Sequence, residues 1–209
     1  RGEPITDSAI VISSMVDAVM LRLSSHEDII EFSKHSSKPV INALSDQSHP
    51  CQILADLMTY QEMNGSIKNK KIAWIGDGCN VCQTYMQAAG IFDFELSIAT
   101  PKGYEPSELF IENYKKNINF YSDPLMACEN ADIIVTDVWT SMGQESEKKQ
   151  RELAFTGFQV DQNMMNQAKK DAIFMHCLPA YREKEVSSEV IDGNQSVVWS
   201  EAENRLHVQ

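Results

Sequence analysis

The stretch "KIAWIGDGCN", residues 71–80, decides the fold class. An apolar strand pattern from Lys71 to Ile75 runs directly into Gly76-Asp77-Gly78, and an apolar stretch with helical spacing follows over Val81 to Ile91. A strand, a glycine turn and a helix in this order are typical of one unit of a parallel α/β sheet. We therefore expect strands and helices to alternate on both sides of this unit.

The rest of the chain fits that expectation. The expected strands are 18–23, 39–44, 71–75, 94–99, 119–121, 132–136, 172–175 and 196–199, and the expected helices are 6–14, 26–36, 50–64, 81–91, 106–117, 124–130 and 159–170. This order predicts an α/β fold with a doubly wound, Rossmann-like parallel sheet over residues 45–209. Residues 1–44 form a small α/β piece that is too short to be a domain of its own.

Composition limits the kind of protein. The chain has 209 residues, of which 43% are hydrophobic, and a formal net charge of -12. Such an acidic chain argues against nucleic acid or an anionic membrane as partner, because both require basic patches. No apolar run approaches the roughly 18 residues of a membrane span. The five cysteines are an odd number in a large chain, so we expect reduced thiols in an intracellular protein.

The glycine turn after Ile75 has two alternative interpretations that the sequence disfavours. A dinucleotide site requires a glycine where Val81 stands and an acid after the next strand, which ends Ile98-Ala99-Thr100. Cys79 and Cys82 form a lone C-x-x-C, whereas a structural zinc site needs a second pair of ligands. A thioredoxin-like pair is possible, but two incidental thiols are the favoured interpretation. No cofactor or metal is therefore expected.

The stretch "FMHCLPAYR", residues 174–182, places a thiol where a site is expected. Pro179 has no N–H and cannot extend a central strand, so the chain must leave the sheet there. Ligands of such sheets bind at the carboxyl ends of the strands. The segments at these ends are 76–80, 100–103, 137–143 and 176–179. A buried cysteine without a functional role is the alternative for Cys177.

A second candidate cluster begins the helix over 50–64. Pro50 suits the first helical position, which puts His49 at the helix N-terminus. There the helix dipole disfavours an imidazolium and leaves a neutral group that can polarise a carbonyl oxygen. Gln52 lies nearly one turn further along the same end. A capping cluster without chemistry is the alternative.

Two arginines complete the set of candidates. Arg22 lies inside an apolar strand pattern, where a buried cation needs an anionic partner or a ligand phosphate or carbonyl. Arg205 follows the last expected strand. Between them, a long polar segment from Asp137 to about Phe158 contains Ser141-Met142-Gly143.

Together these motifs resemble the ornithine carbamoyltransferases. The resemblance runs over essentially the whole chain and rests on five ordered segments, which are 46–52 with His-Pro-x-Gln, 76–80, 137–143 with Ser-Met-Gly, 176–179 with His-Cys-Leu-Pro, and 201–205. It implies two α/β domains, so that 1–44 would be the end of the carbamoyl phosphate domain and 45–209 the ornithine domain. It also implies a homotrimer or a multiple of trimers, with a cytoplasmic location, or a mitochondrial one in a eukaryote.

The resemblance implies a role for each matching residue. Arg22, His49 and Gln52 would hold the carbamoyl group, with Arg205 contacting carbamoyl phosphate from the end of the chain. The residues that would hold ornithine are Asn80, Asp137, Ser141 and Met142. Cys177 and Leu178 would line the meeting point of the two substrates, with Cys177 and Asp137 next to the attacking amine and Arg22 and His49 on the oxyanion.

One family motif is not found in the chain. The phosphate-binding Ser-Thr-Arg-Thr is nowhere in residues 1–209, so we expect these residues alone to have no measurable turnover. Aspartate carbamoyltransferase is the nearest rival, but it has proline where Cys177 stands and lacks the Ser-Met-Gly loop. Transfer to putrescine or to acetylornithine, and an amino-acid-binding role without catalysis, remain open alternatives.

Overall fold

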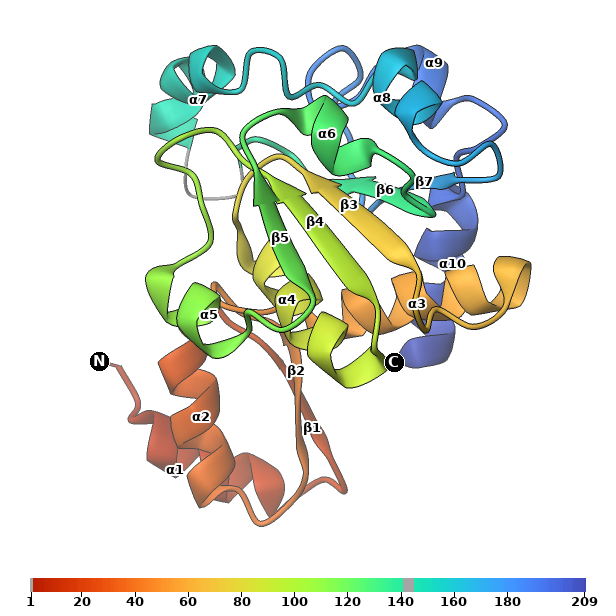
Figure 1. Ribbon diagram of the computed structural model, residues 1–209. Coiled ribbons are helices and arrows are strands. Elements are labelled where there is room, and N and C mark those ends of the chain that lie inside the picture. Colours follow the sequence, from red (N-terminus) through yellow and green to blue (C-terminus); the bar gives the residue numbers. More distant parts are fainter. Residues whose placement is uncertain (1, 141–144) are drawn as a thin grey trace.

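The computed structural model describes residues 2–140 and 145–209 as two lobes of unequal size (Figure 1). The N-terminal lobe consists of α1 (Ile5–Ser13), β1 (Val19–Arg22), α2 (His26–His35) and β2 (Val40–Leu44). Its two strands pair in parallel and its helices pack against each other. The buried cluster of this lobe is small and consists of Ala9, Val19 and Phe32.

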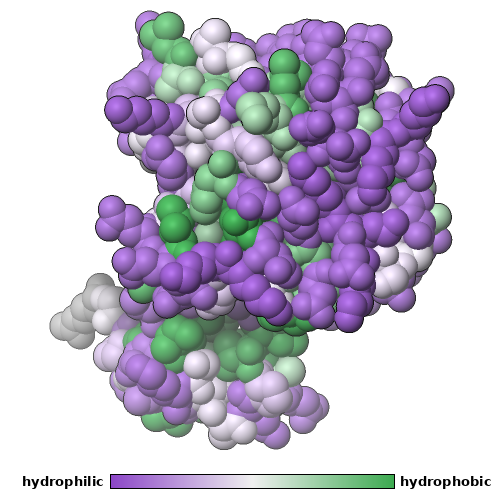
Figure 2. Space-filling view, in the orientation of Figure 1, coloured by the Kyte–Doolittle hydropathy of each residue, from purple (hydrophilic) through white to green (hydrophobic). Residues whose placement is uncertain are grey.

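Many apolar side chains of the N-terminal lobe stay exposed. Ile10 is 58% exposed and Met15 is 74% exposed, and the neighbouring strand residues Met20 and Ile41 are exposed by 43% and 41%. Figure 2 shows hydrophobic residues gathered on this lobe, whereas the larger lobe is mostly hydrophilic on the same side. The N-terminal lobe therefore has only a small core of its own.

The larger lobe is built on one parallel sheet. Its strands are β3 (Lys71–Ile75), β4 (Glu95–Ala99), β5 (Ile118–Tyr121), β6 (Ile133–Thr136) and β7 (Ile173–His176). They lie in the order β5-β4-β3-β6-β7, and every pair is parallel. The strand order reverses between β3 and β6, which is the switch point where doubly wound sheets bind ligands. The predicted fold class is confirmed.

Helices cover both faces of this sheet (Figure 1). They are α3 (Pro50–Asn64), α4 (Asn80–Phe92), α5 (Glu108–Asn113), α6 (Pro124–Cys128), α7 (Lys148–Ala154), α8 (Gln162–Gln167), α9 (Ser188–Ile191) and α10 (Val198–Val208), with a short 3-10 helix, η1 (Glu145–Glu147). None of the helices in the described part of the chain is both long and apolar enough to cross a bilayer.

The alternation of side chains along the strands creates two cores. On β3, Ile72 and Trp74 point into the cluster with α3 and α4, while Ala73 and Ile75 point into the cluster with α6 and α8. Each strand of the sheet centre is thus apolar on both faces, as expected for a parallel sheet buried between two layers of helices.

The tight turn after β3 requires glycine at positions 76 and 78. A Cβ on Gly78 would lie 2.2 Å from the backbone nitrogen of Pro106, so a side chain at this position would force the loop after β4 to move. Gly76 has a φ of +137°, a conformation that L side chains rarely adopt. The motif 76–78 therefore serves close packing of two loops and not only ligand approach.

The expected strand over 196–199 was wrong. Ser196 makes an isolated bridge to Phe174, and the helix α10 begins at Val198. This helix buries Val198, Glu201 and Asn204, a spacing of three residues. The helical period was hidden because two of these three buried positions are polar. The helix expected over 159–170 is also shorter, Gln162–Gln167.

Candidate active site

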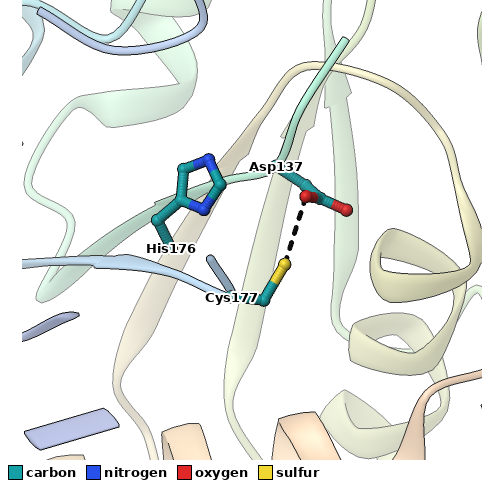
Figure 3. A group of neighbouring side chains, drawn as sticks. All are labelled: Asp137, His176 and Cys177. Carbon is teal, nitrogen blue, oxygen red and sulfur yellow. Dashed lines mark hydrogen bonds between the residues drawn. The ribbon is translucent and has the colours of Figure 1, made fainter. Parts of the chain in front are cut away.

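Asp137 and Cys177 meet because their strands are neighbours in register. Thr136 of β6 pairs with His176 of β7, so the next residue of each strand leaves the sheet at the same edge. The Cys177 thiol donates a hydrogen bond to Asp137 Oδ1 over 3.1 Å (Figure 3). The sequence-predicted pair is thus brought together at the carboxyl ends of the strands.

Asp137 is buried and almost fully hydrogen-bonded. It is 8% exposed, and its Oδ1 also accepts the N–H of Val138 at 2.7 Å. A second thiol, that of Cys79, lies 3.8 Å from Asp137 Oδ2. From the sequence, Cys79 was interpreted as an incidental thiol. Its contact with Asp137 depends on the pairing of β3 with β6, which the sequence does not show. The carboxylate is therefore held between thiols from the loops after β3 and β7.

Cys177 is a thiol and not a thiolate at neutral pH. Burial raises the pKa of this thiol well above its ordinary value, and the negative charge of Asp137 raises it further. The same two causes raise the pKa of Cys79. Both sulfur atoms therefore act as hydrogen-bond donors toward Asp137.

His176 lies beside this pair but both of its ring nitrogens are occupied. Nδ1 accepts the N–H of Leu178 at 3.0 Å, which leaves the proton on Nε2, 3.1 Å from Glu185 Oε1. Ligand atoms of Asp137, His176 and Cys177 lie within 4.8 Å of one another. Since the histidine lone pair is already used, this group is better explained as support for the loop 177–179 than as a metal centre.

His49 is positioned as a neutral donor or acceptor. It is 5% exposed, at the N-cap of α3, and its backbone N–H donates to Thr84 Oγ1 at 2.8 Å. Within the described residues, its Nδ1 is buried without a hydrogen-bond partner. Burial lowers the pKa of His49 to about 4, and the positive charges of Arg205 and Arg22 act in the same direction. The expected neutral imidazole thus has burial as its main cause, ahead of any dipole effect.

Gln52 and Arg205 lie together although they are far apart in sequence. The Arg205 guanidinium donates through Nη1 to Gln52 Oε1. Among the described residues, Arg205 Nε is buried and has no partner. Within the described residues, Arg205 Nε and His49 Nδ1 are thus two buried nitrogen atoms without partners, and a guanidinium N–H is suited to an oxygen atom of a small anion.

The prediction that Arg22 is buried was wrong. Arg22 is the last residue of β1 and is exposed to solvent. The two-stranded sheet of the N-terminal lobe leaves this strand end open, so no internal anion is required. Its positive charge also lowers the pKa of His49, after burial and the charge of Arg205.

The remaining predicted residues have different surroundings. The amide of Asn80 donates to the carbonyl of Ser45 at 2.6 Å, so it ties the start of α4 to the segment after β2. Leu178 follows Cys177 with a φ of +41° and is partly buried. Ser141 and Met142 lie outside the described residues.

A buried ion pair joins three loops at the same edge of the sheet. The Arg151 guanidinium donates to Asp77 Oδ2 and to the carbonyl of Trp139, both at 2.9 Å. It also lies over the ring of Tyr104, 4.9 Å from its centroid. Arg151 was not predicted, because a lysine- and glutamate-rich segment gives no sign of which basic residue is buried.

Sequence reasoning also missed two carboxyl groups beneath Gln52. Asp56 and Glu201 each accept a hydrogen bond from Gln52 Nε2, at 2.8 Å and 2.9 Å. Asp56 could have been found, because residues four apart on a helix share a face. Glu201 could not, since its contact with Gln52 depends on the packing of α10 on α3.

Comparisons with known proteins agree on one family. The chain matches the family models described as "Aspartate/ornithine carbamoyltransferase, carbamoyl-P binding domain" over residues 1–62 and "Asp/Orn binding domain" over residues 68–209. It is 63% identical to the ornithine carbamoyltransferase of Ruthia magnifica subsp. Calyptogena magnifica, covering all of this chain and 70% of that protein.

Solved structures give the same result. The anabolic ornithine carbamoyltransferase of Campylobacter jejuni superposes with a TM-score of 0.94 at 44% identity, over 100% of this chain and 71% of that one. The ornithine carbamoyltransferase of Burkholderia thailandensis gives a TM-score of 0.92 at 48% identity, over 100% and 68%. With this agreement of sequence, fold and site, the chain belongs to the aspartate/ornithine carbamoyltransferase family.

Proposed function

We propose that the protein transfers the carbamoyl group of carbamoyl phosphate to the δ-amine of L-ornithine, giving L-citrulline and phosphate. The observation that carries this proposal is the Cys177–Asp137 hydrogen bond at the carboxyl ends of the strands. It is supported by His49 Nδ1, which is buried and has no hydrogen-bond partner among the described residues. The names of the relatives and of the matching family models support it.

The chemistry is a displacement at the carbamoyl carbon. The neutral δ-amine forms a bond to this carbon, the carbonyl oxygen becomes an oxyanion, and the bond to the phosphate oxygen then breaks. His49 and Arg22 would stabilise the oxyanion, and one such donor is worth roughly 3–4 kcal/mol. His49 suits this role as a neutral donor, because its pKa is lowered to about 4.

The amine has to lose a proton during the reaction. The raised pKa of Cys177 argues against its thiolate as the base. We infer that Asp137 accepts the proton or holds the amine, while the Cys177 thiol fixes the carboxylate by its hydrogen bond. No step requires a metal ion or an organic cofactor.

We further infer the assignment of the binding residues. Gln52, Arg205, Cys177 and Leu178 would contact carbamoyl phosphate, and Asn80, Asp137, Ser141 and Met142 would contact ornithine. For Asn80 this requires that its amide exchange the carbonyl of Ser45 for the substrate. The boundary between a carbamoyl phosphate part, 1–44, and an ornithine part, 45–209, belongs to the same proposal.

We also infer that the protein forms a homotrimer or a multiple of trimers and works in the cytoplasm. The exposed apolar residues of the N-terminal lobe support association, and the five free cysteines support a reducing compartment. Light scattering of the full-length protein tests the trimer.

The substrate is tested with four amines. The full-length protein is assayed with carbamoyl phosphate and ornithine, aspartate, putrescine or N-acetylornithine, and the carbamoylated product is quantified. We expect ornithine to react fastest, and Asp137→Asn to raise the KM for ornithine by about tenfold or more through loss of a charge-assisted hydrogen bond. A faster reaction with another amine, or no product with any of them, would contradict the proposal.

A further inference from the structure

Two carboxyl groups are buried below the carbamoyl phosphate side of the site. Asp56 on α3 is 2% exposed and Glu201 on α10 is 1% exposed. Both accept hydrogen bonds from the same atom, Gln52 Nε2. The mechanism described above uses neither of them, although burying two acids side by side is costly.

The two carboxyl groups decide which way the Gln52 amide points. An amide nitrogen carries two hydrogens, and here one goes to Asp56 and one to Glu201. The Gln52 oxygen must then point the opposite way, where it accepts from Arg205 Nη1. A flipped amide would place its NH2 group against the Arg205 guanidinium, which has no acceptor, so the observed orientation is the one that satisfies Arg205 as well.

We propose that Asp56 and Glu201 are positioning residues that act as a pair, orienting the Gln52 amide and, through it, the Arg205 guanidinium for carbamoyl phosphate. This inference rests on the proposed function of Gln52 and Arg205. Neither carboxyl group touches the substrate, so both act through Gln52 and not as catalytic residues.

Burial raises the pKa of both carboxyl groups. Burial raises the pKa of Glu201 well above its ordinary value, and the charge of Asp56 raises it further. Burial also raises the pKa of Asp56, to about 6, although hydrogen bonds from Tyr85 and Gln52 oppose this rise. The raised pKa of each group favours a proton shared by the pair, as expected for two coupled carboxyl groups.

The surrounding groups leave Asp56 as the group that titrates near pH 6. Tyr85 of α4 donates its hydroxyl to Asp56 Oδ2 at 2.6 Å, and burial raises the pKa of this tyrosine well above its ordinary value. Cys177, which follows β7, also has a raised pKa. Arg205 of α10 supplies the positive charge, and His49, whose pKa is lowered to about 4, stays neutral.

The two members of the pair differ in one contact. Glu201 Oε2 accepts the backbone N–H of His176 at 2.8 Å, directly before Cys177. Asp56 has no such link to the Cys177 loop among the hydrogen bonds of the described residues. Substitutions of Asp56 should therefore affect carbamoyl phosphate, whereas substitutions of Glu201 should affect both substrates.

The experiment compares Asp56→Leu with Asp56→Asn in the full-length enzyme. Leucine cannot accept from Gln52, whereas asparagine keeps an acceptor oxygen and removes the charge. We expect Asp56→Leu to raise the KM for carbamoyl phosphate by about tenfold or more, with the KM for ornithine changed by less than about threefold. Asp56→Asn should restore the KM for carbamoyl phosphate to within about threefold of the wild type.

Glu62→Gln is the matched control. Glu62 also joins α3 to α10, through Asn204 at 2.8 Å, but it does not contact Gln52. An unchanged KM for carbamoyl phosphate in Asp56→Leu would overturn the inference, and so would an equal increase in the control. If the wild-type enzyme makes no citrulline, the proposed function fails first. If the wild-type enzyme makes citrulline and the Asp56 variants have the same KM for carbamoyl phosphate, only the positioning role fails.

A pH series keeps the inference testable if Asp56→Leu does not fold. Asp56→Asn imitates the protonated form of Asp56, so the wild type should bind carbamoyl phosphate up to about threefold more tightly than this variant at pH 7.5 and equally at pH 5. Protonation of the phosphate itself affects both proteins alike and cancels in the ratio. A ratio that stays constant from pH 5 to 7.5 would overturn the inference.

Discussion

The Cys177 thiol donates to Asp137 Oδ1 at 3.1 Å, although 40 positions separate the two residues. The contact follows from the parallel pairing of β6 with β7, in which Thr136 lies opposite His176. Burial and the Asp137 charge keep the thiol protonated. Donation by sulfur, and not nucleophilic attack by it, is therefore the property to test.

Substitution of Cys177 separates these two roles. Cys177→Ser keeps a donor for Asp137, whereas Cys177→Ala removes it. If the thiol acts as a donor, kcat should fall less than about tenfold in the serine variant and by about tenfold or more in the alanine variant. Steady-state assays measure both, with Cys128→Ala as control because Cys128 lies in the core with α6, α8 and α9. Equal loss in the two Cys177 variants would refute the donor role.

His49 predicts a particular dependence of stability on pH. Its pKa is about 4 in the folded protein and 6.5 when unperturbed, so the unfolded chain binds more protons between these values. The contribution of His49 to the free energy of unfolding is therefore complete above pH 6.5 and is lost as the pH falls toward 4, by up to about 3 kcal/mol. Asp56, whose pKa is raised to about 6, acts in the opposite direction between pH 3.8 and 6.

The two contributions are separated by comparing variants. Urea unfolding at pH 4.5, 5.5 and 7 should show a smaller loss of stability on acidification in His49→Gln than in the wild type, while Asp56→Asn should show a larger loss. Parallel curves for His49→Gln and the wild type would mean that His49 is not held neutral by the fold.

The Asp77–Arg151 ion pair should stabilise the loops at the site edge. Both side chains are almost fully buried, and removing one partner leaves the other charge unpaired. We expect Arg151→Met to lower the free energy of unfolding by about 3 kcal/mol. The double variant Asp77→Asn/Arg151→Met should lose less than the sum of the two single losses, because the first substitution already removes the interaction.

Arg182 provides the comparison for this prediction. It pairs with Asp192 in good geometry, but both side chains are largely exposed. Arg182→Met should therefore change the unfolding midpoint much less than Arg151→Met. If the loss of unfolding free energy in the double variant equals the sum of the two single losses, Asp77 and Arg151 do not stabilise each other.

Residues 1–209 expressed alone should show no measurable turnover. A phosphate dianion requires several charge-assisted contacts, each worth roughly 1.5–3 kcal/mol. Arg22 and Arg205 are present, but the family's Ser-Thr-Arg-Thr motif is not in these residues. Citrulline formation at saturating substrates is the measurement, and turnover within about tenfold of 10 s⁻¹ would show that the motif is dispensable.

The sequence by itself determined the fold class and the edge of the sheet that carries the candidate site. The apolar runs that stop before Gly76, Asp137 and Cys177, and the turn residues that follow them, are local properties of the chain. The helical start at Pro50 was equally local, so His49 was assigned to the helix N-terminus before any tertiary contact was known. The helix at 198–208 was missed because its buried stripe contains Glu201 and Asn204.

Only the tertiary structure decided which polar groups are buried against each other. Asp56 and Glu201 have the same sequence character as surface acids, and Arg151 looks like its basic neighbours. Arg22 looked buried and is exposed, because the two-stranded sheet leaves its strand end open. The spacing of apolar residues predicts which face of a helix or strand is buried. Which charged groups pair depends on elements that are distant in sequence but packed together, such as α3 and α10. For that reason the sequence located the candidate site, while the packing of the helices on the sheet set its charges and hydrogen bonds.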